Sequence, residues 1–131
     1  MLFQEALYAR ASAGAELVAI VGEEISFVER PRAVPAVTFQ VISRVNSETM
    51  EGLDGFVEVR VQADSWSTDY VEAARLGEIL IALLTPPATV AGWVFEAASV
   101  EGPRDLQEKV DGIGLVHRSN TDFIMRAWPA T

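Results

Sequence analysis

The chain has 131 residues, half of them hydrophobic, and a formal net charge of −9 at pH 7. This length suits one domain with a sizeable core, so we expect residues 1–131 to form a single domain. The absence of cysteine excludes disulfides and thiolate metal sites, and the acidic charge argues against tight nucleic-acid binding, which needs Lys and Arg to replace counterions on phosphates.

A first helix is predicted over residues 1–11. Phe3, Leu7 and Ala11 recur every four positions and so share one face of a helix. Arg10 falls largely outside that face, as do the other polar residues of the segment. The pattern is typical of an amphipathic helix that packs one side on a core.

The next segments predict a short helix and two strands. Residues 15–21 suit a further helical turn or two that ends at Gly22. Residues 25–28 are apolar and flanked by acids, which favours a short edge strand. Residues 29–35 contain two prolines, each of which disfavours helix in the preceding residue, so we expect an extended connection. Residues 37–45 alternate apolar and polar side chains and indicate a second strand.

A long acidic loop is predicted over residues 46–55, at the tip of a hairpin. Loops of this size often carry binding function, and a solvated loop without a partner is the plainer alternative. The residues that we expect to contact another protein are Ser47, Glu48, Met50, Glu51 and Asp54.

A strand, a corner and a helix are predicted to follow. Residues 57–64 alternate valine or alanine with polar residues, the pattern of a strand with one buried face. Residues 65–68 should turn the chain. Asp69 is well placed as an N-cap, with Glu72 at capping-box spacing, and a helix is predicted over residues 70–84.

That helix is apolar on more than one side and is stopped by the prolines at residues 86–87. A helix with so wide an apolar surface is either central to the domain or partly buried by a neighbouring subunit. The residues that we expect at such a subunit interface are Tyr70, Ala74 and Ile81 on the helix and Trp66 before it.

The C-terminal third predicts two more strands. Residues 90–100 are rich in β-branched and aromatic side chains, and residues 115–128 alternate again. The charged segment between them, residues 102–114, carries two turn signals and is predicted to be a connection. The expected fold class is α+β, in the order α-β-β-β-α-β-β, with a mostly antiparallel sheet of four to five strands packed by two main helices.

No cluster of residues forms a recognised catalytic or metal-binding motif. His117 is the only histidine and has no ligand-type residues beside it, which favours a structural role. Asp64, Asp69 and Glu72 could bind a cation or act as acid and base, but the last two suit a helix cap and Asp64 could pair with Arg60. We therefore predict no catalytic residue, no metal ligand and no cofactor.

The pattern resembles the tail-completion family of tailed phages, which includes tail terminator and head–tail joining proteins of phages, prophages and gene transfer agents. The likeness extends from about residue 7 to residue 128. It rests on Val21-Gly22, Ile25, Pro35-Ala36-Val37, the run Arg60-Val61-Gln62-Ala63-Asp64-Ser65-Trp66, Thr68, Glu72-Ala73, Asp111-Gly112 and Trp128. Residues 103–109 match no fixed pattern of the family.

The resemblance implies a fold related to the terminator of the lambda tail. Such subunits form a hexameric ring at the head-proximal end of the tail tube, where the ring stops tail growth and joins the tail to the head connector. The implied partners are other copies of the chain, the tail tube protein and the head connector or stopper protein, and the implied location is the neck of the virion, assembled in the host cytoplasm. DNA would pass through the ring unbound, because an acidic wall repels phosphate.

Two other functions remain open at this stage. One is a small acidic cytoplasmic adaptor whose hairpin loop recognises a protein, and the other is an enzyme that uses the acids between residues 64 and 72. No apolar run approaches the ~20 residues that span a bilayer, and the first residues lack the pattern of a signal peptide, so we expect no contact with a membrane.

Overall fold

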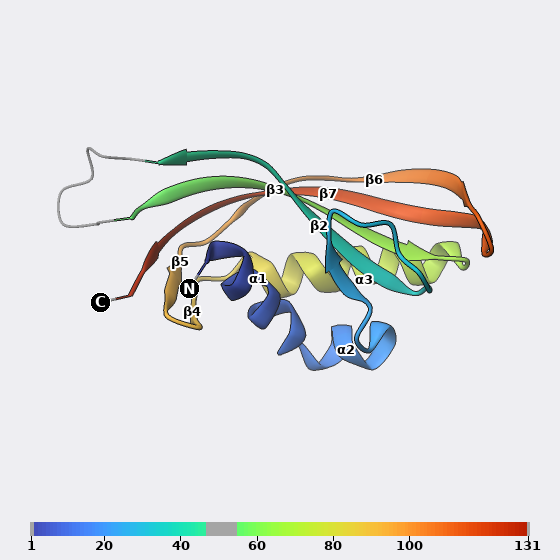
Figure 1. Ribbon diagram of the computed structural model, residues 1–131, viewed down its shortest axis with the longest axis horizontal. Helices are drawn as coiled ribbons and strands as arrows, with labels where there is room; N and C mark the ends of the chain where they lie inside the picture. Colours follow the sequence, from blue (N-terminus) through green and yellow to red (C-terminus); the bar gives the residue numbers. More distant parts are fainter. Residues whose placement is uncertain (1, 47–54, 131) are drawn as a thin grey trace.

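The computed structural model describes residues 2–46 and 55–130, which form an α+β fold (Figure 1). Its helices are α1 (Phe3–Ser12), α2 (Ala15–Val21) and α3 (Tyr70–Leu84). Its strands are β1 (Ile25–Phe27), β2 (Ala36–Asn46), β3 (Val57–Ser67), β4 (Ala88–Val90), β5 (Trp93–Phe95), β6 (Ser99–Val110) and β7 (Gly114–Pro129).

The seven strands form one curved sheet built around β7. Along one direction the order is β7, β3, β2, β1, and on its other edge β7 pairs with β6 over one part and with β5, followed by β4, over another. Only the β1–β2 pair is parallel. The prediction of a mostly antiparallel sheet is confirmed, whereas the predicted four to five strands are too few.

The helices all lie on one face of the sheet (Figure 1). Alternate residues of β3 and β7 point toward them and are at most 1% exposed: Val57, Val59, Val61, Ala63, Phe123, Met125 and Ala127. These side chains pack with Phe3 and Leu7 of α1 and with Leu76 and Leu80 of α3 in one core. The intervening residues of the strands point away from the helices, onto what we call the open face.

The α3 helix has the bounds that its sequence predicts. Asp69 is the N-cap, and its Oδ1 accepts a hydrogen bond from the N–H of Val71 at 3.0 Å. Glu72 does not reach back to Asp69 as a capping box would. Instead, Ser67 Oγ accepts from the Asp69 N–H at 3.0 Å and donates to Glu72 at 2.9 Å. The chain turns later than expected, because β3 continues to Ser67.

The sequence interpretation is wrong for the segment after α3. Instead of one strand over residues 90–100, β4 and β5 form a tight hairpin with Ala91 and Gly92 at positive φ between them. Instead of a connection over residues 102–114, β6 pairs with β7 along nearly its whole length. Its Gly102–Pro103 step lies at a register shift within the strand, so the turn signal marks a bulge rather than an end.

Arg10 also departs from its expected place. Its side chain is 5% exposed and lies between α1 and the end of α3, where its guanidinium donates to the carbonyl oxygens of Leu83, at 3.0 Å, and Pro86. The guanidinium lies 5.2 Å from the ring centroid of Phe95. Burial lowers the pKa of Arg10 below its usual value. A cation at this position donates to carbonyls that have no partner within the helix, and it interacts favourably with the negative end of the helix dipole.

Candidate interaction surfaces

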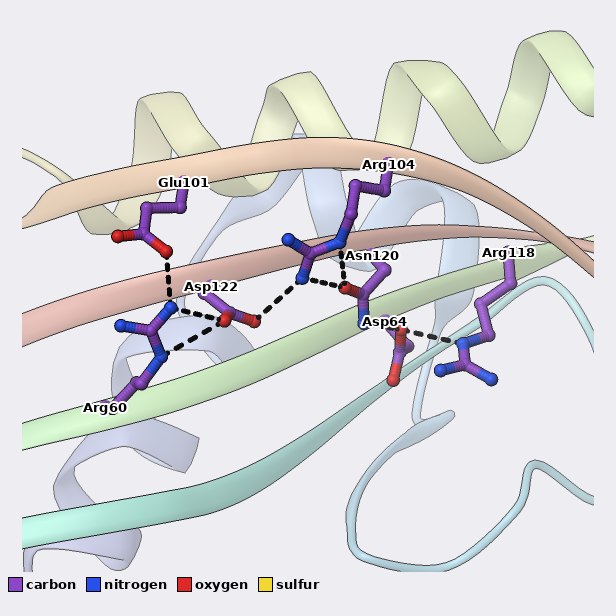
Figure 2. Close-up of polar contacts among 7 residues, drawn as sticks. All are labelled: Arg60, Asp64, Glu101, Arg104, Arg118, Asn120 and Asp122. Atoms are coloured by element: carbon purple, nitrogen blue, oxygen red, sulfur yellow. Dashed lines mark hydrogen bonds and ion pairs between the residues drawn. The ribbon is translucent and has the colours of Figure 1, made fainter.

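The open face carries a network of ion pairs that crosses β6, β7 and β3 (Figure 2). Asp122 of β7 lies at its centre and is 7% exposed. One of its carboxylate oxygens accepts from Arg60 of β3 at 2.8 and 3.1 Å, and the other lies 3.4 Å from Arg104 of β6. Arg60 also pairs with Glu101, and Arg104 donates to Asn120 Oδ1 at 2.6 and 3.1 Å. The hydrogen bonds to Glu101 and Asp122 raise the pKa of Arg60.

The network continues toward the β6–β7 turn. Asp64 of β3 accepts from Arg118 at 2.9 Å and from Asn120 Nδ2 at 2.7 Å, both of β7. Arg118 also donates to Glu108 at 2.8 Å and lies over the ring of Trp66, 5.3 Å from its centroid. The expected pairing of Asp64 with Arg60 is therefore wrong. Both residues pair across strands instead: Asp64 stands directly opposite Asn120, whereas Arg60 stands opposite Ile124 and reaches diagonally to Asp122.

The charges of the open face balance. Together with Arg30 of the β1–β2 connection, which pairs with Glu108 of this face, the ion-paired residues are five basic and five acidic: Arg30, Arg60, Arg104, Arg118 and Arg126 with Glu58, Asp64, Glu101, Glu108 and Asp122. The whole net charge of −9 therefore lies on the rest of the chain. Sequence reasoning missed this arrangement, since its partners come from strands far apart in the chain.

Tyr70 and His117 meet at the N-terminal end of α3. Their rings pack edge to face with centroids 5.6 Å apart, and the Tyr70 hydroxyl donates to Asp105 of β6 at 2.9 Å. The hydrogen bond to Asp105, together with the charge of that carboxylate, raises the pKa of Tyr70. Tyr70 thus joins the start of α3 to β7 through His117 and to β6 through Asp105.

The residues expected at a subunit interface fall into two groups. Tyr70 is 48% exposed, and Ala74 and Ile81 are partly exposed on the same helix. Tyr70 and Ala74 line a groove between α3 and β6 that Asp105 closes from the other side. Trp66 is 4% exposed, and its indole N–H donates to Thr38 at 2.9 Å. The structure therefore places Trp66 inside the subunit, in a small cluster on the open face with Ala36 and Val116.

The loop residues expected to contact a protein, Ser47, Glu48, Met50, Glu51 and Asp54, lie outside the described residues. The acids considered for chemistry are Asp64, Asp69 and Glu72, and each has a separate partner: Arg118, the α3 backbone and Ser67. Within residues 2–46 and 55–130, no cluster of three His, Cys, Asp or Glu side chains could hold a metal ion. No helix of that part of the chain is long and apolar enough to cross a membrane.

Comparison with known proteins identifies the family. The sequence pattern of the family described as tail completion protein gp17 matches residues 5–123. The chain belongs to this family. Tail completion proteins are structural proteins of phage tails, so this chain is a component of the virion tail.

A solved structure supports the fold. A chain from the virion of a native gene transfer agent particle superposes with a TM-score of 0.58 at 14% sequence identity, covering 98% of this chain and 95% of that one. At that identity the likeness concerns the fold alone. No curated protein matches the chain by sequence. The family resemblance noted in the sequence is thus confirmed, and with it the virion as the place where this tail completion protein acts.

Proposed function

We propose that six copies of the chain form a ring at the head-proximal end of the tail tube, where the ring ends tail growth and joins the tail to the head connector. The observation that carries this proposal is the family match over residues 5–123. The exposed side of α3 supports a contact between subunits, because it combines Tyr70, Val71 at 56% exposure, and Ala74. The partners of the ring are the tail tube protein on one side and the connector or stopper protein on the other.

DNA passes through the ring without being held. The net charge of −9 supports this, because binding to DNA requires cations that replace counterions on the phosphates. The arginines of the open face do not contradict it, since each has a carboxylate partner. A ring of this composition adds little friction to the passage of a double helix.

Removal of the gene tests the proposal directly. Particles from cells that lack it should have tails without a defined head-proximal end, together with heads that have no tails, when imaged by negative-stain electron microscopy. Supply of the gene on a plasmid should restore joined particles. Normal particles in its absence would contradict the proposal.

The loop between β2 and β3 is our proposed contact with a neighbouring ring or tube. These two strands extend past the helices (Figure 1), and the described residues on either side of the segment that joins them, Asn46 and Gly55, are both exposed. Reversal of its charges by Glu48→Lys, Glu51→Lys and Asp54→Lys should prevent head–tail joining and leave the subunit folded. The matched control reverses the exposed acids Glu16, Glu23 and Glu96, which lie outside the exposed side of α3, and should leave joining intact. Joined, infectious or transducing particles from the loop variant would refute the contact.

A further inference from the structure

Within residues 2–46 and 55–130, two long strands of the sheet each have an outer edge to which no strand is paired, in addition to the outer edges of the three-residue strands β1 and β4. One is the outer edge of β2 over residues 40–46, beyond the short stretch that pairs with β1. The other is the outer edge of β6, whose only strand partner is β7. The N–H and C=O groups of a free edge are a template for another strand, and soluble proteins usually restrict access to them.

In both edges an irregularity of the strand restricts access by another strand. The β2 register shifts between Val41 and Ser43, and the β6 register shifts between Glu101 and Arg104, with Pro103 in between. A bulge or a proline interrupts the row of hydrogen-bonding groups and discourages indiscriminate pairing. Beyond the shifts, residues 43–46 of β2 and 104–110 of β6 run in regular register. Each edge thus offers one regular segment to a partner.

An exposed apolar side chain lies on each of these segments. Val45 is 63% exposed and Leu106 is 40% exposed. Val45 stands opposite Glu58, and Leu106 stands opposite Arg118, so both point to the open face. Two apolar residues on the same face of two free edges become cross-strand neighbours if one edge pairs with the other.

We propose that β6 of one copy pairs with β2 of the next copy, antiparallel, with Leu106 beside Val45. This proposal rests on the ring of the proposed function and names the contact that builds it. The strands β2, β3, β7 and β6 alternate in direction, so copies in the same orientation meet with antiparallel edges. Since the two edges differ, the contact is head-to-tail and leaves a free edge on each side for the next copy, as the proposed ring requires, rather than stopping at an isolated dimer.

The pairing also sets how neighbouring copies are displaced. Leu106 is level with Arg118 and Trp66, whereas Val45 is level with Glu58. Each copy is therefore shifted along the strands by the length of β3 from Glu58 to Trp66, about 26 Å for a strand rise of ~3.3 Å per residue. Such a stagger tilts the strands against the ring axis, which closure of a sheet requires.

Engineered cysteines test the contact, because the natural chain has none. Particles that carry Val45→Cys together with Leu106→Cys are purified, oxidised and examined on a non-reducing gel with an antibody to the chain. We expect a ladder of covalent multiples that ends at the full ring and collapses to monomer with reductant. A mixture of the two single variants in one particle should give covalent dimers, and either single variant alone should give none.

The control moves one cysteine to the other face of the same strand. Val45→Cys with Gln107→Cys should give no ladder, since Gln107 stands opposite His117 and points to the helical face. One outcome is that electron microscopy shows rings in which Val45→Cys crosslinks to none of Arg104→Cys, Leu106→Cys and Glu108→Cys. That result would refute the edge pairing and leave the proposed ring supported. If the particles contain no ring of this chain, the proposed function itself fails.

Discussion

Arg10 is a buried cation whose hydrogen bonds go to backbone carbonyls rather than to a carboxylate. The substitution Arg10→Met keeps much of the side-chain volume but leaves the Leu83 and Pro86 carbonyls without their donor. Hydrogen bonds to charged groups are worth about 1.5–3 kcal/mol each, so we expect a loss of about 3 kcal/mol in the free energy of unfolding, measured by urea denaturation. The exposed Arg75 provides the control, since Arg75→Met should change stability by less than about 0.5 kcal/mol. Equal effects of the two substitutions would show that Arg10 is not a cap of α3.

Tyr70 gives a pH dependence whose sign follows from its raised pKa. The folded state favours the protonated phenol, so this group stabilises the fold below its unfolded pKa of about 10, and the contribution is lost as the pH rises through the higher folded value. Absorbance at 295 nm follows phenolate formation, and the difference between the wild type and Tyr70→Phe isolates this one tyrosine. We expect its midpoint above pH 10 in the wild type and a lower midpoint in Asp105→Asn. An unchanged midpoint in Asp105→Asn would remove Asp105 as the cause.

At the scale of elements, α3 lies so close to β7 that only glycine fits at one contact. A Cβ at Gly77 would lie 2.6 Å from Ser119 Oγ, which is buried and has no hydrogen-bond partner among the described residues. If residue 119 is alanine, the Oγ atom is gone, and a Cβ at residue 77 lies 3.5 Å from the Cβ of residue 119, which is an ordinary van der Waals contact. The change Gly77→Ala brings a gain in helix propensity of about 1 kcal/mol that the clash opposes in the natural chain.

A double-mutant cycle measures this contact. We expect Gly77→Ala to be more favourable in the Ser119→Ala background than in the wild type by about 1–2 kcal/mol of unfolding free energy. Thermal or urea unfolding of the four proteins gives the coupling. If the effects of the two substitutions on the unfolding free energy simply add, the Ser119 side chain moves aside without cost, and close packing is not the reason for glycine at residue 77.

The elements that the sequence predicts well are those with local causes. The cap at Asp69 and the prolines after Leu84 define α3 from within a few residues, and alternation defines β3. The β6 strand was missed because its Gly102–Pro103 step has the local chemistry of a turn, and only pairing with β7 makes it a bulge. Arg10 was misplaced for a related reason, since the carbonyls that bury it belong to residues more than 70 positions away.

The open face could not be predicted for the same physical reason. Arg60 and Asp122 are 62 positions apart, and the register of β3 against β7 decides that they meet. The interface residues proposed on α3 did not depend on such long-range pairing, because helical periodicity alone places Tyr70 and Ala74 on one side of the helix. Trp66 precedes the helix, so helical periodicity does not place it, and its ring fills a cluster within the subunit.

For the whole molecule, the distribution of charge matters more than its sum. The open face is balanced because its arginines are paired with carboxylates, while the remainder of the chain is strongly acidic. This pairing predicts that the wild-type chain does not retain DNA, although it displays several arginines on a single sheet face. A basic face would attract phosphates and slow the passage of a double helix through a ring.

Removal of the pairing carboxylates should therefore create DNA binding. The variant Glu58→Gln, Glu101→Gln, Glu108→Gln leaves the arginines of the open face with an excess charge of about three, and we expect weak binding of a 30-base-pair duplex that falls steeply with salt. Fluorescence anisotropy at 50 mM salt measures it, with no binding by the wild type. The control with Glu16→Gln, Glu23→Gln and Glu78→Gln has the same net charge but leaves the open face balanced, so it should bind no DNA. Equal binding by both variants would show that net charge alone, and not the pairing on the open face, keeps DNA from the protein.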